Sequence, residues 1–152
     1  MDDISKITDS IYISSFLDDS RIKNLDLEGF GLIISMIGPT LSGKNLEKSG
    51  CKILSVKTHD NFLLPIPMKA IGRGVEAAAE ALKSGHKILI YCREGKRRSV
   101  TMAACILIAN GTGSADAMQL IKKMRLAADP YRWYVKKRIR KFEKFWKDKL
   151  NP

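Results

Sequence analysis

The chain has 152 residues, of which 45% are hydrophobic and 28% are charged, and this composition is typical of one soluble globular domain over 1–152. No apolar run is long enough for a membrane span, and the first residues lack the regions of a secretory signal peptide, so we expect a cytoplasmic protein. Three cysteines without a CxxC pair predict neither a disulfide framework nor a zinc site, and we expect no metal and no cofactor. The formal net charge of +11 favours anionic partners: phosphorylated protein, other phosphate esters, nucleic acid and anionic lipid all fit it.

The first half of the sequence predicts three strands and one helix. Residues 11–13 have the pattern of a short strand, and Asp18 opens a helix that we expect to continue to about residue 30. The apolar run 32–37 ends at a Gly-Pro pair and is typical of a strand that is buried on both faces of a parallel sheet. Residues 53–56 repeat this pattern more weakly.

The second half predicts four helices and one strand. Apolar residues at helical spacing predict helices over 68–82, 99–110, 114–127 and 129–150, and residues 87–91 form a short buried strand. Ser114 is expected to cap the third of these helices, and Asp129 with Pro130 to start the last one. Strands that alternate with helices predict an α/β fold, with a central, mostly parallel sheet of four to five strands and helices on both faces.

One loop, between the strand 87–91 and the next helix, carries the residues that we expect to do chemistry. A strand-to-helix turn aims successive backbone N–H groups into one concavity, and the helix adds its positive dipole end, so the loop predicts a phosphate cradle. Arg98 can hold two phosphate oxygens through its planar guanidinium group. The expected phosphate-binding residues are Arg93, Glu94, Gly95, Lys96, Arg97 and Arg98.

Cys92 opens this loop and is the expected nucleophile. The positive field of the loop favours its thiolate, which is the reactive form. Ser99 follows Arg98 and is placed to form a hydrogen bond with the sulfur when it leaves. The alternative is that Cys92 is a small buried residue at a strand end and that the basic residues form a solvated turn. Cys51 and Cys105 lack such surroundings and are expected to pack in the core.

Cys92, Arg98 and Ser99 together resemble the Cys-x5-Arg-Ser/Thr element of the protein tyrosine phosphatase superfamily, and the short chain is similar to the dual-specificity phosphatases. The resemblance implies a protein tyrosine phosphatase-like fold and a hydrolase that cleaves phosphate monoesters through a phosphocysteine intermediate. It also implies an aspartate general acid on a loop before the nucleophile. Asp60 lies between a strand and a long helix and is assigned this catalytic role, with His59 as the second choice. A turn or capping aspartate is the alternative for Asp60.

Three features depart from the family pattern. Tyr91 precedes the nucleophile where the family usually has histidine, so we expect weaker activation of the thiol. Arg93, Lys96 and Arg97 add positive charge and indicate an unusually anionic substrate, so phosphoinositides and RNA 5′-phosphates are alternatives to phosphorylated protein. The Pro-Asn pair that often follows the penultimate helix is missing; residues 129–131 occupy that region and are assigned no role.

Two other function classes are open. Residues 38–44 nearly complete a nucleotide-binding GxxxxGK[ST] motif, but Asn45 replaces the hydroxyl that ligates Mg²⁺, and the next strand follows too soon for the long helix that this motif opens. The second class is a non-catalytic module that only binds phosphate, although binding alone needs neither a thiolate nor an acid. The basic face of the C-terminal helix is either a solvated surface or an attraction site for RNA, anionic lipid or acidic protein.

Overall fold

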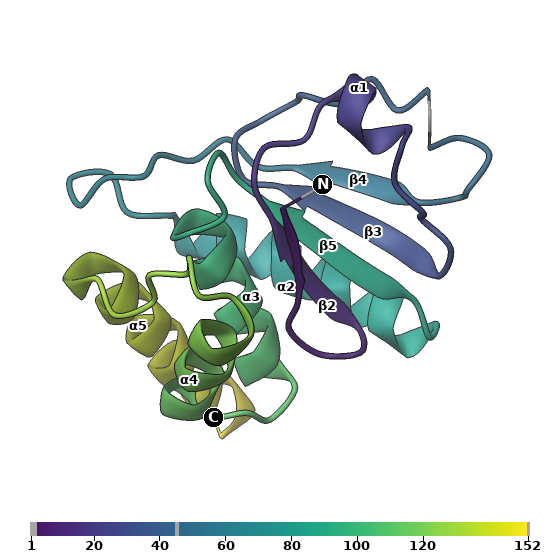
Figure 1. Ribbon diagram of the computed structural model, residues 1–152. Coiled ribbons are helices and arrows are strands. Elements are labelled where there is room, and N and C mark those ends of the chain that lie inside the picture. Colours follow the sequence, from purple (N-terminus) through teal and green to yellow (C-terminus); the bar gives the residue numbers. More distant parts are fainter. Residues whose placement is uncertain (1–2, 45, 152) are drawn as a thin grey trace.

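The computed structural model describes residues 3–44 and 46–151 and has a five-stranded sheet in this part of the chain (Figure 1). The strands are β1 (Ile4–Lys6), β2 (Ile11–Ser14), β3 (Phe30–Ser35), β4 (Lys52–Ser55) and β5 (Lys87–Tyr91). Their order across the sheet is β1-β2-β5-β3-β4; β1 is antiparallel to β2, and the other neighbours are parallel. The predicted central, mostly parallel sheet of four to five strands is therefore confirmed.

The helices lie on both faces of this sheet, as predicted, but unequally. They are α1 (Asp19–Ile22), α2 (Met68–Lys83), α3 (Arg98–Ala109), α4 (Ser114–Met124) and α5 (Trp133–Leu150). The helices α2 and α3 pack on one face, and α4 and α5 pack against α3, so that all four surround the larger hydrophobic core (Figure 1). The opposite face is covered by α1 and nearby loops, whose smaller core includes Leu17, Ile22 and Leu46.

Strand β5 occupies the centre of the sheet and sets the position of the loop that follows it. Ile88 and Ile90 belong to the larger core, whereas Leu89 and Tyr91 belong to the smaller one, as the alternation of side chains along a strand requires. All four side chains are at most 1% exposed. The next residue therefore emerges at the middle of the carboxyl edge of the parallel strands, where α/β proteins commonly bind ligands.

The helix predicted from Asp18 to about residue 30 is wrong beyond Ile22. Asp18 does cap α1, because its carboxylate accepts a hydrogen bond from the Arg21 N–H at 3.0 Å. After this single turn the chain forms local turns, in which the Glu28 N–H donates to the Asp26 carboxylate at 3.0 Å. Such side-chain to backbone bonds compete with helix continuation and lead the chain directly into β3.

Two further elements differ from the prediction. Strand β1 was not predicted, because three partly exposed residues at a sheet edge carry no apolar pattern. Helix α5 begins at Trp133 and not at Asp129, because the Asp129 N–H donates to the Lys96 carbonyl at 2.8 Å and holds this segment outside the helix.

The structure does not support the nucleotide-binding alternative, because no long helix follows residues 38–44 in the described part of the chain. Residues 38–44 lie in the loop after β3, and turns follow from Leu46 in the described part of the chain, whereas the motif requires a long helix. Asn45 itself lies outside the described residues. No helix within residues 3–44 and 46–151 is long and apolar enough to cross a membrane.

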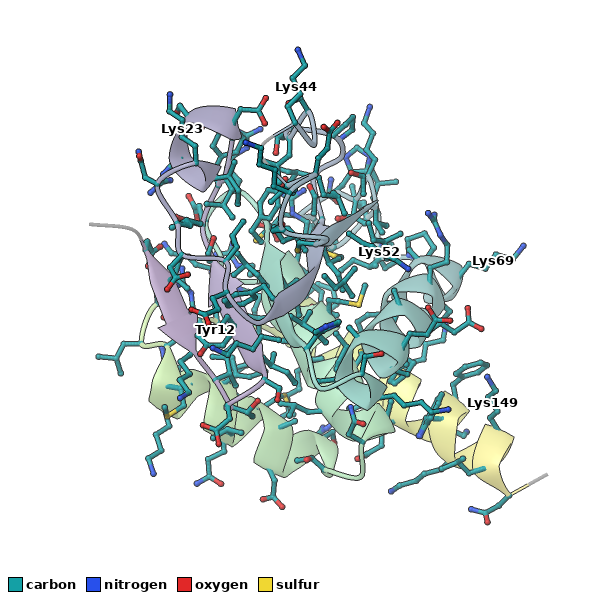
Figure 2. The ribbon with its side chains drawn as sticks, turned by 90° about the vertical axis from the view of Figure 1, so that its right-hand side faces the viewer. Tyr12, Lys23, Lys44, Lys52, Lys69 and Lys149 are labelled. Carbon is teal, nitrogen blue, oxygen red and sulfur yellow. The ribbon has the colours of Figure 1, made fainter. Side chains whose placement is uncertain are left out.

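The positive charge is distributed over the molecule. Figure 2 shows that Lys23, Lys44, Lys69 and Lys149 project outward from different segments of the chain. The basic face of α5 is therefore one of several cationic surfaces, and charge alone does not single it out.

Helix α4 is capped from a distant part of the chain. Its N-cap is Gly113, which has no side chain to offer, and Ser114 is the first helical residue, not the capping residue that we predicted. The Ser114 N–H and hydroxyl donate to the Glu143 carboxylate of α5 at 2.6 and 2.9 Å. Partial burial opposes the effect, but these hydrogen bonds and nearby cations lower the pKa of Glu143 from its ordinary value of 4.5.

We expect Glu143→Gln to lower the free energy of unfolding by about 1 kcal/mol at neutral pH, because an amide accepts more weakly than a carboxylate at a helix N-terminus. A carboxyl group with a depressed folded-state pKa stabilises the fold above its unfolded pKa, near 4.5, and this contribution is lost as the pH falls through the folded value. The difference between wild type and variant should therefore shrink at acid pH. Urea denaturation over a pH series measures it, and a difference that is independent of pH would contradict the cap.

Candidate active site

Four consecutive backbone carbonyl groups of the loop after β5 are bonded to groups outside the loop. The carbonyl oxygens of residues 93–96 accept hydrogen bonds from the Phe16 N–H, the Arg125 guanidinium and the Asp129 N–H, at distances of 2.7–3.1 Å. The C=O and N–H groups of a planar trans peptide point in opposite directions. The N–H groups of residues 94–97 are therefore directed to the inner side of the loop, which creates a backbone concavity of the kind that binds anions.

Cys92 lies at the floor of this concavity and is 3% exposed. The Gly95 N–H donates to its sulfur at 3.2 Å, and the Ser99 hydroxyl lies 3.2 Å from the same atom. Helix α3 begins at Arg98, so the positive end of its dipole is next to the loop. The Gly95 N–H donor, the Ser99 hydroxyl and the helix N-terminus are groups of the kind that accommodate an anion.

A cavity of about 230 Å³ opens beside Cys92 and brings most of the predicted site residues together. Its lining consists of Asp60, Cys92, Arg93, Glu94, Lys96, Arg97 and Arg98. Gly95 and Ser99 are buried next to this lining. Arg98 is fixed in the wall because its guanidinium donates to the Thr58 carbonyl at 2.8 Å. Cationic side chains outnumber carboxylates in the lining, so the cavity is suited to an anion.

The turn at Gly95 is required by the packing of the protein itself. Its φ angle is +66°, which side-chain-bearing residues rarely adopt. A Cβ atom at this position would lie 2.5 Å from Arg125 Nη2 and 2.7 Å from the Ser14 carbonyl oxygen. Any other residue would therefore displace either the arginine or the backbone of β2.

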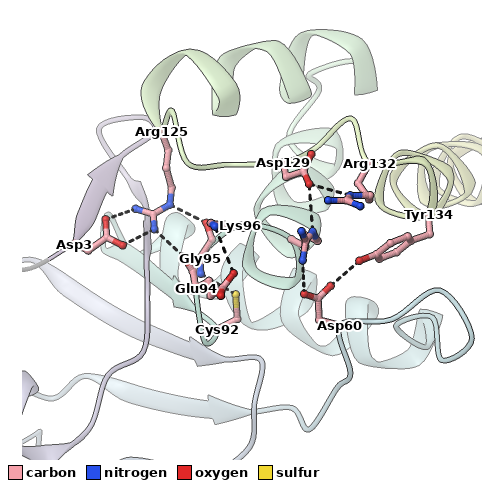
Figure 3. A network of polar contacts seen from close by, with 11 residues as sticks. Asp3, Asp60, Cys92, Glu94, Gly95, Lys96, Arg125, Asp129, Arg132 and Tyr134 are labelled. Carbon is pink, nitrogen blue, oxygen red and sulfur yellow. Dashed lines mark hydrogen bonds and ion pairs between the residues drawn. The ribbon is translucent and has the colours of Figure 1, made fainter.

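Arg125 is a site residue that the sequence did not reveal. It is only 2% exposed, and its guanidinium donates to the carbonyls of Gly95 at 2.7 Å and Glu94 at 3.1 Å (Figure 3). The same group donates to the Asp3 carboxylate at 2.8 and 3.0 Å. The hydrogen bonds from Arg125 lower the pKa of Asp3, against the opposing effect of partial burial. In the sequence Arg125 is one more basic residue at the end of a basic helix, and its partner precedes a strand that was not predicted.

Asp60 lies at the mouth of the cavity, on the segment before α2. One carboxylate oxygen accepts from Arg97 at 2.9 Å and the other accepts from the Tyr134 hydroxyl at 2.9 Å (Figure 3). Arg97 also donates to Asp129 at 3.2 Å, so a residue to which we assigned no role takes part in the same network. Burial and the contact with Asp60 raise the pKa of Tyr134. His59, the second choice for the acid, lines a different cavity beside α5.

Tyr91 points to the opposite side of the sheet from Cys92. Its side chain is fully buried in the smaller core, and its hydroxyl shares a hydrogen bond with the Thr40 hydroxyl. Cys92 belongs to the larger core, on the face that carries α2 and α3. The tyrosine hydroxyl is therefore used for packing the far face and is not directed at the sulfur.

The other two cysteines, Cys51 and Cys105, are buried and do not line the cationic cavity. Both are free, as expected of packing residues. Burial raises the pKa of Cys51 to about 11 and also raises the pKa of Cys105. Both side chains therefore remain neutral thiols at physiological pH.

Comparison with known proteins identifies the fold. No protein-family model matches the sequence, and no curated protein matches it either. Among solved structures, PTPMT1 in complex with PI(5)P is similar, with 19% identity over 98% of this chain and 99% of that chain and a TM-score of 0.84. Human DUSP28 has 19% identity over 95% of each chain and a TM-score of 0.78. A human tyrosine phosphatase-like serine/threonine/tyrosine-interacting protein has 18% identity over 94% of this chain and 97% of that chain and a TM-score of 0.72. The chain therefore has the fold of the protein tyrosine phosphatase superfamily, as the Cys92 loop led us to expect.

We expect Arg125→Met to lower the free energy of unfolding by about 2 kcal/mol, because the variant leaves two loop carbonyls without their buried donor. The loop should also lose its geometry, so that orthophosphate no longer raises the midpoint of urea denaturation. The matched control is Lys123→Met, which changes an exposed residue of α4 two positions before Arg125 and should leave both quantities unchanged. If Arg125→Met kept the stabilisation by orthophosphate, the proposed support of the loop by Arg125 would be wrong.

Proposed function

We propose that this protein is a cysteine-dependent phosphatase that hydrolyses phosphate monoesters, with Cys92 as the nucleophile. The observation that carries the proposal is the position of the Cys92 sulfur, which lies on the floor of a cationic cavity within hydrogen-bond distance of the Gly95 N–H and the Ser99 hydroxyl. An inert buried cysteine needs no such surroundings, as Cys51 and Cys105 illustrate.

We assign phosphate binding to the loop residues 93–98. The inward N–H groups of the loop would hold the phosphoryl oxygens, and Arg98 would pair with two of them through its guanidinium group. Lys96 and Arg97 add positive charge at the cavity wall. These contacts strengthen as charge moves onto the phosphoryl oxygens and the leaving group, so they favour the transition state over the ground state.

The reaction would proceed in two displacements. In the first, the Cys92 thiolate attacks phosphorus, the sulfur–phosphorus bond forms, and the ester oxygen leaves with a proton from Asp60. In the second, Asp60 takes a proton from water, the oxygen of that water attacks phosphorus, and the sulfur–phosphorus bond breaks. The Ser99 hydroxyl and the Gly95 N–H then stabilise the departing thiolate. The products are an alcohol and inorganic phosphate.

The contacts of Asp60 support its role as the acid and base. Arg97 and Tyr134 hold the carboxylate at the cavity mouth, on the side where a leaving group would depart. Proton transfer requires a carboxyl group within hydrogen-bond reach of that oxygen, and substrate binding would have to draw Asp60 inward from its present partners. Arg97 and Tyr134 would hold Asp60 at the mouth until substrate binds and would release it when it turns inward.

Phosphorylated tyrosine, serine or threonine in proteins is one substrate class, and it follows from the resemblance to the dual-specificity phosphatases. Phosphoinositides are the alternative, and the complex of PTPMT1 with PI(5)P supports it. Lys96 and Arg97 are paired with carboxylates, but the four cations of the cavity lining still outnumber its two carboxylates, and this excess also favours a substrate with more than one anionic group.

A module that binds phosphate without turnover is the second candidate function. It is favoured by the shared fold of the tyrosine phosphatase-like interacting protein and by Tyr91, whose hydroxyl bonds with Thr40 and not with the sulfur. Such a module would bind orthophosphate through the same loop and would release none from an ester.

Release of phosphate from an aryl phosphate tests the proposal. We expect Cys92→Ser to abolish release while orthophosphate still binds, because the hydroxyl is a far weaker nucleophile. We expect Asp60→Asn to lower kcat about 100-fold for a poor leaving group and much less for a good one. Cys51→Ser, far from the cavity lining, is the matched control and should retain kcat.

A wild-type protein that binds orthophosphate but releases none at any pH would establish the binding module instead. If Asp60→Asn lowered kcat equally for good and poor leaving groups, the general acid would be a residue other than Asp60.

A further inference from the structure

Four apolar side chains are exposed at the mouth of the Cys92 cavity, and we call them the apolar rim. The apolar rim consists of Phe62, Leu63, Leu64 and Trp133, which are 55%, 73%, 51% and 59% exposed. Large apolar side chains that gather in one exposed patch mark an interaction surface, whereas single exposed ones need no explanation.

The apolar rim is one surface although it comes from two segments. Phe62, Leu63 and Leu64 follow Asp60 on the segment before α2, and Trp133 is the first residue of α5. The rings of Phe62 and Trp133 lie 5.6 Å apart. Figure 1 shows this segment protruding from the body of the protein beside the start of α5.

The apolar rim is connected to the cavity through its sequence neighbours. Asp60 lines the cavity, and its carboxylate accepts a hydrogen bond from Tyr134, the neighbour of Trp133. A surface that covers the apolar rim therefore also meets the opening in which the phosphate of a substrate would enter.

Cationic side chains lie at the cavity and at the start of α5. Arg93 is exposed on the loop, Lys96 is partly exposed beside it, and Arg132 directly precedes Trp133. The carboxylates on this side are already in contact with cations: Glu94 with Lys96 at 3.6 Å, and Asp129 with both Arg97 and Arg132. Five cations on this side, Arg93, Lys96, Arg97, Arg98 and Arg132, still outnumber its three carboxylates, Asp60, Glu94 and Asp129, so the face keeps a net charge of +2 that favours an anionic surface.

We propose that this face docks on an anionic phospholipid bilayer, so that the substrate is a phosphate monoester carried by a lipid head group. This inference rests on the proposed phosphatase function. Trp, Phe and Leu with flanking Arg and Lys are the residues of protein surfaces that bury themselves about 5–10 Å into the boundary of head groups and acyl chains. Insertion of the apolar rim would bring the cavity mouth, where Asp60 lies two residues before Phe62, towards the lipid head groups.

Binding to vesicles tests the docking surface independently of turnover. We expect the wild type to sediment with vesicles of phosphatidylcholine mixed with phosphatidylserine and not with vesicles of phosphatidylcholine alone, because the attraction is partly electrostatic. Leu63→Asp should weaken this binding about tenfold or more, since it replaces an inserted apolar side chain with a charge. The matched control is Leu150→Asp, which changes a side chain of 62% exposure at the other end of α5, about 25 Å from Trp133. This variant should bind like the wild type.

A second measurement concerns the substrate. The rate of phosphate release from a phosphatidylinositol phosphate in vesicles is divided by the rate for its short-chain, water-soluble analogue. We expect this ratio to fall about tenfold for Leu63→Asp and to stay constant for Leu150→Asp.

The outcomes separate the two proposals. Equal vesicle binding by Leu63→Asp and the wild type, with aryl phosphate still hydrolysed, would overturn the docking surface and leave the phosphatase function in place. Vesicle binding that depends on Leu63, in a protein that hydrolyses no phosphate ester, would support the docking surface and overturn the proposed function. A larger effect of Leu63→Asp on a soluble phosphopeptide than on lipid in vesicles would assign the apolar rim to a protein partner.

Discussion

The direction of the peptide groups in residues 93–96 is the constraint on which the site depends. A loop can present its N–H groups to an anion only if its carbonyl groups are satisfied elsewhere, because buried polar groups require partners. Here β2 and its continuation, the end of α4 and the segment before α5 each contribute a donor to these carbonyls or pack against them. The concavity around Cys92 is therefore built by tertiary structure, and the loop sequence alone does not determine it.

A second network joins the segments that border the cavity. Arg97 bonds with Asp60 on one side and with Asp129 on the other, and Tyr134 adds the start of α5. Exposed ion pairs contribute little to stability one by one, but here several of them connect the Cys92 loop with the segments before α2 and α5. The network therefore sets the position from which Asp60 would move to reach a leaving group.

The parts of the fold that could be predicted are those in which local pattern and burial agree. The apolar run 87–91 is β5 with the same limits, and the Ala-rich segment from Met68 is α2. The helix predicted from Asp18 failed because short polar side chains bonded with the local backbone, which apolar periodicity does not reveal. The loop residues from Cys92 to Ser99 could be singled out because their chemistry is contiguous in sequence.

The supporting residues could not be found in this way. Arg125, Asp129 and Tyr134 act through contacts that span from 30 to 122 positions of the chain, and each has an ordinary local context. The apolar rim could not be predicted from the sequence either, because Phe62 and Trp133 become neighbours only through the packing of α5.

Arg125, which supports the Cys92 loop, also contacts the edge strand β1. Arg125 bonds with Asp3 and with the Ser5 hydroxyl at 3.0 Å, and Ser5 belongs to β1, an edge strand of three residues with a single neighbour. Short edge strands open locally at a much lower free energy than the centre of a sheet. Opening of β1 removes the Asp3 carboxylate from the buried Arg125 guanidinium. An unpaired buried charge is unfavourable, so Arg125 then exchanges its bonds with the loop carbonyls for bonds with water. The order of the Cys92 loop is thus linked to fraying at the sheet edge, and amide hydrogens in β1 and in the loop are expected to exchange together with solvent.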